Sequence, residues 1–235
     1  MAIPHILHQT WKDHDVPERF RESVESWRRH HPDWEYRFWT DDDLEALVAA
    51  DYPGVLDLFR AYREPIQRVD AARYMILHRF GGVYSDLDIV CVRPITPLAE
   101  HVVVLPDTAP AGVSNDLMMA EAGHPFFQEL VDGLGAAAAR WDRRVVPRHF
   151  RVLLSTGSLY VTGALRRTRW RGDVTVLGAE EYRSQDPAKA YVLHRPGDTW
   201  AGWDTRALTW LHRHWGWVVG VAALVALGVL AVALG

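Results

Sequence analysis

The stretch "GGVYSDLDIV", residues 81–90, joins a pair of glycines to an apolar run that carries two aspartates, Asp86 and Asp88. Val, Leu and Ile in such a run are typical of a buried strand. In one continuous strand, residues two apart face the same way, so we expect Tyr84, Asp86 and Asp88 to share a face. Burying an unpaired carboxylate costs free energy, so the pair is expected beside a cation or at an opening of the fold.

Two carboxylates at the end of a buried strand form a hard oxygen site that suits Mn²⁺ or Mg²⁺. A metal held by one or two carboxylates keeps coordination positions for the phosphates of a substrate. A calcium loop needs further oxygen ligands and a glycine in a longer pattern, which "DLDIVCVRP", residues 86–94, lacks. A D-x-D pair alone is common by chance, so the surrounding sequence decides what it means.

Strand-like and helix-like segments alternate over about residues 1–205. Strand patterns occur over residues 5–11 and 34–40, and the spacing of apolar residues between Pro17 and Pro32 predicts a helix. Thr40 and Asp43 form a capping-box pattern that opens a helix over 41–50, so we interpret its run of three aspartates as a helix N-terminus. A further helix is predicted from Pro65 to about Phe80, before the glycine pair. This order predicts an α/β domain with a mainly parallel sheet, in which ligands bind at the carboxyl ends of the strands.

The composition fits an ordinary globular chain of 235 residues, long enough for one α/β domain with an appendage, with 49% apolar and 24% charged residues. The net charge of −4 does not indicate a particular class of partner, and no feature of the sequence indicates binding to nucleic acid. Nine arginines and one acid fall between Arg140 and Arg171, which makes that segment +8 and the remainder −12. The single cysteine, Cys91, excludes an internal disulfide framework and suits a reducing compartment.

The C-terminal residues 215–235 contain no charge and no proline. As a helix they would be roughly 31 Å long at about 1.5 Å per residue, close to the thickness of a bilayer core, and they have no polar stripe. We therefore predict a transmembrane helix over 215–235 after a juxtamembrane linker, 206–214. Basic residues before the span, and a start without a secretory signal, place the upstream domain in the cytoplasm. Gly216 and Gly220 have the spacing of a possible homodimer contact within the membrane.

A single span would hold the catalytic core close to the bilayer. The arginines between Arg140 and Arg171 that are exposed would then face anionic headgroups, at about 1 kcal/mol for each basic residue near such a surface. Pairing of individual arginines with acids elsewhere in the chain is the alternative. The first arrangement suits an acceptor whose lipid stays in the bilayer.

The stretch "RVDAARYMILHRFGGVYSDLDIVCVRPI", residues 68–95, resembles the D-x-D sugar-transfer region of family 32 glycosyltransferases. That family includes yeast-type α-mannosyltransferases and inositol-phosphoceramide mannosyltransferases, and the clostridial glucosylating toxins are more distantly similar. The likeness extends over most of residues 3–200. Its segments are "IPHILHQTW" (3–11), "PDWEYRFW" (32–39), "SNDLMMA" (114–120), "STGS" (155–158) and "HRPGDTW" (194–200). This chain departs from the family at Ser158, often Pro there, and at Thr199, often Ser.

The resemblance implies a GT-A type, Rossmann-like nucleotide-sugar-binding fold over residues 1–205 and a role for each matching residue. Asp86 and Asp88 match the motif that binds the metal and the donor's ribose and diphosphate. The expected catalytic residues are Asp86, Asp88, Arg73 and Asn115, and the expected metal ligands are Asp86, Asp88 and His194. The expected donor-binding residues are Trp11, Asp70, Arg73, Tyr74, Asp86, Thr199 and Trp200, while Asp116 is a weaker match near the transferred sugar. Apart from the resemblance, Asp70 and Arg73 form an ordinary ion pair on one helix face, Trp11 packs in the core and His194 is structural.

The resemblance also implies a reaction. A hexose (mannose, glucose or galactose) would pass from a GDP- or UDP-sugar to a lipid-linked or glycolipid acceptor with retention of configuration. The metal ion and Arg73 would neutralise the charge that develops on the leaving diphosphate. The alternatives are a metal-dependent sugar-nucleotide hydrolase or phosphoryl-transfer enzyme, and a non-catalytic adaptor anchored to the membrane.

Overall fold

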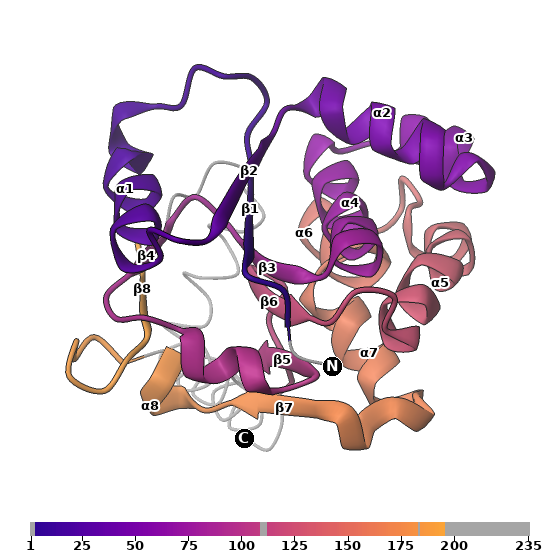
Figure 1. Ribbon diagram of the computed structural model, residues 1–235. Helices are drawn as coiled ribbons and strands as arrows, with labels where there is room; N and C mark the ends of the chain where they lie inside the picture. The colour runs from indigo at the N-terminus through magenta and orange to yellow at the C-terminus, as the bar shows by residue number, and fades with distance from the viewer. Residues whose placement is uncertain (1–2, 109–111, 183, 196–235) are drawn as a thin grey trace, which may run out of the picture. The chain divides into compact units, whose positions relative to one another are not determined.

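The computed structural model describes residues 3–108, 112–182 and 184–195 (Figure 1). The chain divides into two compact units, Met1–Val146 with Phe150–Gly197, and Pro147–His149 with Asp198–Gly235. The first unit contains all of the described strands. Thr199, Trp200, the expected linker at 206–214 and the expected transmembrane helix at 215–235 lie outside the described residues. Within the described ranges, no helix is long and apolar enough to cross a membrane.

A six-stranded mixed sheet forms the centre of the first unit, in the order β2-β1-β3-β6-β5-β7. β1 pairs in parallel with β2 and β3, and β5 with β7, whereas β6 runs antiparallel to both β3 and β5. The expectation of a mainly parallel sheet is therefore correct only for the N-terminal half and for the β5–β7 edge. The strands are β1 (Ile6–Thr10), β2 (Glu35–Trp39), β3 (Gly82–Ser85), β5 (Val103–Pro106), β6 (Leu117–Ala120) and β7 (Val174–Leu177).

The helices begin largely where local signals predict. Thr40 caps α2 with a complete capping box to Asp43, and α4 begins at Pro65 and ends before Gly81. The α-helices are α1 (Arg21–His30), α2 (Asp41–Asp51), α3 (Leu56–Ala61), α4 (Pro65–Phe80), α5 (Pro125–Trp141), α6 (Arg148–Ser155), α7 (Ser158–Arg167) and α8 (Ala179–Tyr182). Short 3₁₀ helices occupy Glu18–Phe20, Pro53–Val55, Thr96–Glu100 and Arg169–Asp173.

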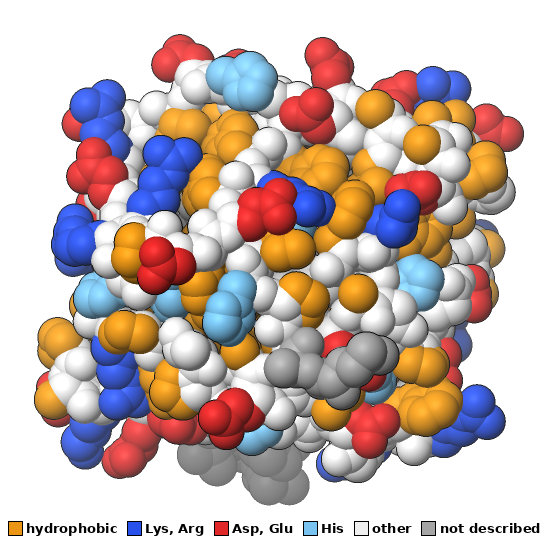
Figure 2. Space-filling model, viewed as in Figure 1, with side chains coloured by type: hydrophobic (Ala, Val, Ile, Leu, Met, Phe, Trp, Pro, Cys, Tyr) orange, Lys and Arg blue, Asp and Glu red, His pale blue; other side chains and the backbone are white. Residues whose placement is uncertain are grey.

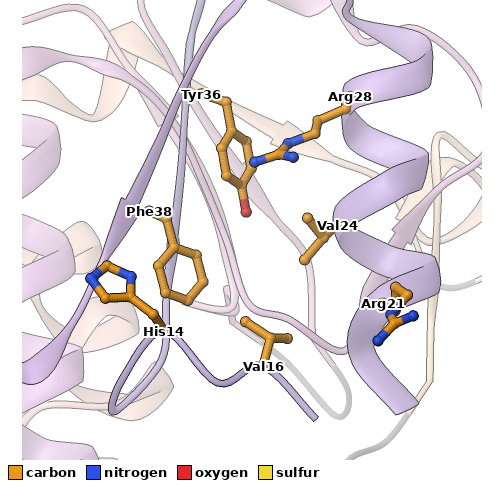
Figure 3. Close-up of a pocket in the computed structure, with 7 residues that line it drawn as sticks. All are labelled: His14, Val16, Arg21, Val24, Arg28, Tyr36 and Phe38. Atoms are coloured by element: carbon orange, nitrogen blue, oxygen red, sulfur yellow. The ribbon is translucent and has the colours of Figure 1, made fainter. Parts of the chain in front are cut away.

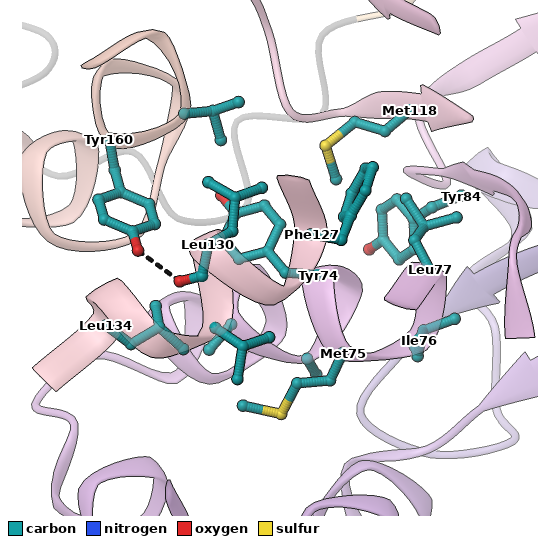
Figure 4. Packing of buried hydrophobic residues seen from close by; sticks show 14 of the residues in the cluster. Tyr74, Met75, Ile76, Leu77, Tyr84, Met118, Phe127, Leu130, Leu134 and Tyr160 are labelled. Atoms are coloured by element: carbon teal, nitrogen blue, oxygen red, sulfur yellow. Dashed lines mark hydrogen bonds between the residues drawn. The ribbon is translucent and has the colours of Figure 1, made fainter. Parts of the chain in front are cut away.

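Apolar clusters cover the two faces of the sheet. On one face, α4 and α5 pack together, and Figure 4 shows Tyr74, Phe127 and Leu130 interleaved there, with the Tyr160 hydroxyl donating to the Leu130 carbonyl. On the other face, Trp27 of α1 is fully buried against residues of β1 and β3. Acidic and basic side chains are interspersed over the face seen in Figure 2, as the small net charge leads us to expect.

The stretch that was expected to form one strand is divided. β3 ends at Ser85, and a second strand, β4 (Ile89–Cys91), begins three residues beyond Asp86. The Ile89 amide donates to the Asp86 carbonyl at 3.2 Å, which closes a tight turn. β4 leaves the main sheet and pairs antiparallel with β8 (Val192–His194) in a separate two-stranded sheet. Asp86 and Asp88 therefore lie in a turn, and the shared face expected for a continuous strand is not the arrangement found.

Side chains of helix α1 hold β4 in its position away from the main sheet. The hydroxyl of Ser23 and the indole N–H of Trp27 both donate to the Ile89 carbonyl, at 2.6 and 2.9 Å. The Cys91 amide donates to the Ser26 hydroxyl at 2.9 Å. These side chains satisfy backbone groups on the edge of β4 that faces away from β8, where the described residues provide no further strand. The D-x-D turn therefore lies between two strands that are both held in place.

Candidate active site

A buried arginine on α4 lies at the centre of the site. Arg73 is 1% exposed, and its Nη2 atom lies 3.2 Å from a carboxylate oxygen of Asp70 and 3.2 Å from one of Asp86. Its Nη1 atom also donates to the backbone carbonyl of Asn115, and its guanidinium lies 4.6 Å from the centre of the Tyr84 ring. The predicted ion pair on the helix is therefore present, but it belongs to a network that joins α4 to the D-x-D turn and to the segment before β6.

Asp70 is held from three directions. Besides Arg73, its carboxylate accepts hydrogen bonds from Nδ2 of Asn115 at 2.9 Å and from the hydroxyl of Thr156 at 3.0 Å. Burial raises the pKa of Asp70, while the charge of Arg73 acts against that rise. The hydroxyl of Tyr74, next along the same helix face, donates to the Thr156 carbonyl. Helix α4, the segment before β6 and the end of α6 thus meet at one carboxylate.

Asp86 has a strongly perturbed acidity. Its pKa is raised to about 7, chiefly by burial and also by the charges of Asp88 and Asp116, while the charge of Arg73 acts against the rise. The side chain nevertheless remains 30% exposed, because one edge of the turn is open while protein surrounds the rest. The hydroxyl of Tyr84 donates to Oδ1 of Asp86 at 3.0 Å. A carboxylate held this firmly at an opening is typical of a functional site.

Asp88 and His194 come together across the two-stranded sheet. Ile89 is the register partner of His194, and Nε2 of His194 lies 3.4 Å from Oδ2 of Asp88. The hydrogen bond to Asp88 raises the pKa of His194. The structure therefore brings together two predicted metal ligands that lie more than 100 residues apart in sequence, while Asp86 is engaged by Arg73 and Tyr84.

The side chains around Asp88 offer part of a metal site. In the described part of the chain, no group of three or more His, Cys, Asp and Glu side chains is arranged to hold a metal ion. A carboxylate oxygen and an imidazole nitrogen facing each other, as in Asp88 and His194, are nevertheless donors that suit Mn²⁺. These two residues fit such an ion; the three-residue ligand set remains a prediction.

The segment before β6 contributes backbone and side chains. The Asp86 amide donates to the Asp116 carbonyl at 2.8 Å, which continues the β3–β6 pairing to the start of the turn. The Asp116 carboxylate accepts from the hydroxyl of Tyr182, and its other oxygen, Oδ1, is buried without a hydrogen-bond partner among the described residues. Asn115 joins Asp70 and Arg73 directly, so the expectation that it lies in the site agrees with its position.

Trp11 stands apart from this network. Its ring packs edge-on against Phe20 at 5.3 Å, and its backbone amide donates to the Trp39 carbonyl. Its indole N–H is buried and has no hydrogen-bond partner within the described ranges. Its proposed stacking on a nucleotide base remains a prediction.

Sequence reasoning missed three residues that complete the site. Thr156 lies in the segment 155–158 and Tyr84 in the stretch 81–90, but the sequence predicted no role in the site for either, and it predicted nothing for Tyr182. Each supplies a hydroxyl to a carboxylate of the network. Thr, Tyr and Ser are too frequent for any spacing to have marked them; only the fold brings them to the aspartates.

A separate hollow lies between α1 and β2, on the opposite face of the sheet from α4. It has a volume of about 280 Å³, and Figure 3 shows its main features, with the Arg28 guanidinium over the Tyr36 ring at 4.2 Å from its centre. None of the residues predicted for the site lines it. Its lining residues are His14, Val16, Arg21, Val24, Arg28, Tyr36 and Phe38.

Comparison with known proteins agrees with this geometry. Residues 17–105 match the family model described as a glycosyltransferase sugar-binding region containing the DXD motif. The chain is 35% identical over 234 residues to inositol phosphoceramide mannosyltransferase 1 of Schizosaccharomyces pombe, covering 97% of this chain and 72% of that protein. It is 34% identical to a mannosyl phosphorylinositol ceramide synthase of Saccharomyces cerevisiae, covering 90% of this chain and 56% of that one.

Solved structures support the fold. The PaToxG glycosyltransferase superposes with a TM-score of 0.56 at 15% identity, over 71% of this chain and 70% of its own. The UDP-bound glycosyltransferase domain of the YGT toxin superposes with a TM-score of 0.50 at 10% identity, over 74% and 79% of the two chains. At these identities the likeness concerns the fold alone, and that fold is the GT-A-like α/β arrangement expected from the sequence.

Proposed function

Because this chain belongs to the glycosyltransferase family whose sugar-binding region contains the DXD motif, we propose that it transfers a hexose from a nucleotide-sugar to a lipid-linked acceptor. The names of its relatives support mannose as the sugar. They also support a phosphoglycolipid similar to inositol phosphoceramide as the class of acceptor. The observation that carries the proposal is the buried network of Asp70, Arg73 and Asn115, which ends at the partly exposed Asp86.

The residues of the network have distinct proposed roles. Two carboxylates and a carbonyl surround the Arg73 guanidinium, so we assign it to fixing Asp86 and Asn115 in place for the donor. This differs from a role in which Arg73 itself neutralises the leaving diphosphate, because its charge is already matched by two carboxylates. Asp70 and Asn115, braced by Thr156, would orient the hydroxyl groups of the sugar.

A divalent cation completes the proposal. Asp88 and His194 would hold it, with Asp86 as the third expected ligand. When bound, such an ion supplies positive charge for the departing diphosphate. The partly exposed edge of the turn leaves Asp86 and Asp88 accessible to a nucleotide-sugar from solution. We also propose that the enzyme works at the cytoplasmic face of a membrane, as the apolar residues 215–235 lead us to expect.

The decisive experiment is a transfer assay on the purified full chain with Mn²⁺. GDP-mannose, UDP-glucose and UDP-galactose are each supplied with and without inositol phosphoceramide in detergent micelles. We expect release of GDP from GDP-mannose to depend on the lipid, with a mannosylated lipid as product. Release that ignores the lipid would instead identify a sugar-nucleotide hydrolase, and turnover of a UDP-sugar alone would correct the proposed donor.

A further inference from the structure

Helix α6 buries two polar side chains and turns three of its apolar side chains outward. Arg151, Val152 and Ser155 are buried, whereas Phe150 is 39% exposed and both Leu153 and Leu154 are partly exposed. The three apolar residues are three and four positions apart, so they form one stripe along the helix. An outward apolar stripe on a surface helix is the reverse of the usual arrangement.

The buried partners of α6 fix this orientation. Nη2 of Arg151 lies 2.7 Å from Oε1 of Glu64, and its Nε lies 3.7 Å from a carboxylate oxygen of Asp142. The hydroxyl of Ser155 accepts from the side-chain amide of Gln67 at 2.8 Å. Rotating the helix to bury the stripe would leave a buried charge unpaired, at a cost of about 3–5 kcal/mol. The stripe is therefore held outward by the core.

The segment that leads into α6 adds charge next to this stripe. Val145 is 84% exposed, the most exposed of the large apolar side chains in the described part of the chain. Arg143 and Arg144 directly before it are exposed too, and among the described residues no carboxylate lies within ion-pair distance of either. Of the nine clustered arginines, Arg151 is thus a core residue, whereas this pair is available to an anionic partner.

We propose that this docking surface, defined as Arg143, Arg144, Val145 and the stripe Phe150–Leu153–Leu154, rests on an anionic lipid bilayer. Guanidinium groups beside exposed apolar side chains match a surface in which phosphates border acyl chains. A lipid surface also satisfies both parts at once, since the arginines meet headgroups while the valine and the stripe enter the boundary below them.

The position of α6 in the fold gives this surface a use. The helix exposes Phe150 near its start, and Thr156 directly after its end bonds to Asp70 in the active site. Ser155 and Thr156 are buried on the inward side of the helix end, and an α-helix with its side chains is about 10–12 Å across. Docking through the stripe would thus bring the network of Asp70 and Arg73 to within about one helix diameter of the bilayer, where a lipid acceptor presents its headgroup. The inference rests on the proposed lipid acceptor.

The test uses an environment-sensitive fluorophore on the full chain. Val145→Cys is labelled, because the natural Cys91 is buried; Val176→Cys on β7, where valine is 47% exposed, is the matched control. We expect the label at 145 to shift to shorter wavelength with vesicles of phosphatidylcholine and phosphatidylglycerol, but not with phosphatidylcholine alone. The label at 176 should stay unchanged. A label at 145 that is equally protected without vesicles would show that the chain's own residues 215–235 cover the surface, and it would overturn the proposal.

A second variant tests how much the two arginines contribute to docking. R143Q/R144Q should lower the ratio of docked to undocked label at 145 by about 30-fold, at about 1 kcal/mol for each arginine, whereas R28Q/R29Q on α1 should not change it. The same preparations are assayed for transfer in detergent micelles, where no bilayer is present. Transfer without a vesicle response overturns the docking surface and leaves the proposed function standing; a vesicle response without transfer contradicts the proposed function alone.

Discussion

Nη2 of Arg73 and Oδ1 of Asp86 lie 3.2 Å apart, and this contact ties the middle of α4 to the first aspartate of the D-x-D turn. The same nitrogen contacts Asp70, so one buried cation balances two carboxylates. Neither carboxylate has another basic side chain within ion-pair distance in the described part of the chain. We therefore expect stability and activity to be coupled at Arg73.

Replacing Arg73 by Met should reduce both properties together. We expect the free energy of unfolding to fall by about 3–5 kcal/mol, because two buried carboxylates lose their partner. Transfer should fall by about 100-fold or more, since Asp86 and Asn115 lose their brace. Denaturant unfolding and single-substrate kinetics measure the two losses. The control is Arg60→Met, which breaks an exposed pair with Glu45 and should change stability by about 1 kcal/mol at most.

Asp88→Asn should leave the fold intact and abolish most transfer. The amide keeps the shape of the carboxylate but removes its charge, and we expect a loss of about 10²-fold or more, as when one electrostatic contact to a transition state is removed. Far-UV circular dichroism tests whether the fold is intact, and a Mn²⁺ titration of turnover tests the loss of transfer. Near-native turnover at low Mn²⁺ would contradict the proposed metal ligands. Asp57→Asn, at an exposed position on α3, serves as the control.

The stability of the fold should depend on pH through the protonation of His8. Its Nε2 lies 3.0 Å from the Gly81 carbonyl, and Nδ1 accepts from the indole of Trp39 at 3.2 Å, so the buried ring is neutral. Burial lowers its pKa to about 4, against 6.5 for a free histidine. Between these values the unfolded chain binds the proton, so stability is complete above about pH 6.5 and falls as the pH drops to about 4, by about 3 kcal/mol in total.

The measurement is the difference between the wild type and His8→Gln. Glutamine does not titrate, so the difference in the free energy of unfolding between the two proteins should change across this window, while other groups cancel. A difference that stays constant from pH 7 to pH 4 would contradict the neutral, buried state of His8.

Gly82→Ala should destabilise the sheet. The residue has φ +89°, and a Cβ atom there would lie 2.5 Å from the Ile6 carbonyl oxygen on β1. We expect a loss of at least about 1–3 kcal/mol from backbone strain, with the clash in addition. Gly54→Ala is the matched control, because nothing lies within 4 Å of its added Cβ and its φ is not in the left-handed region. Thermal unfolding of the two variants makes the comparison, and equal melting temperatures would show that β1 and β3 adjust freely.

The sequence predicted the helix boundaries that depend on neighbouring residues. The cap at Thr40 and the start of α4 at Pro65 depend on residues within one turn, and both are confirmed. The spacing of Asp70 and Arg73 likewise predicted their ion pair. The break after Ser85 was not predictable, because "VYSDLDIV" reads as one strand until Ser23 and Trp27 of α1 hold the second half away.

Long-range contacts explain what was missed in the site. Thr156 reaches Asp70, and Tyr182 reaches Asp116, across long stretches of chain, and no residue next to either hydroxyl marks it as special. The antiparallel strands were not predicted for a similar reason, because β6 pairs with β3 only after two intervening strands, β4 and β5. Family resemblance supplied Asn115 and His194, which spacing alone did not distinguish from ordinary polar residues.

The pairing of β4 with β8 imposes an order on how the active site is completed during synthesis. All members of the charge network are present once the first 156 residues have emerged, so the network is able to form early. These members are Asp70, Arg73, Asp86, Asn115 and Thr156. His194 emerges later, and β4 has no strand partner until then. We therefore expect a ribosome-bound chain to assemble the arginine-centred half of the site before the half proposed to hold the metal, and a nascent chain stalled between these points should contain the first without the second.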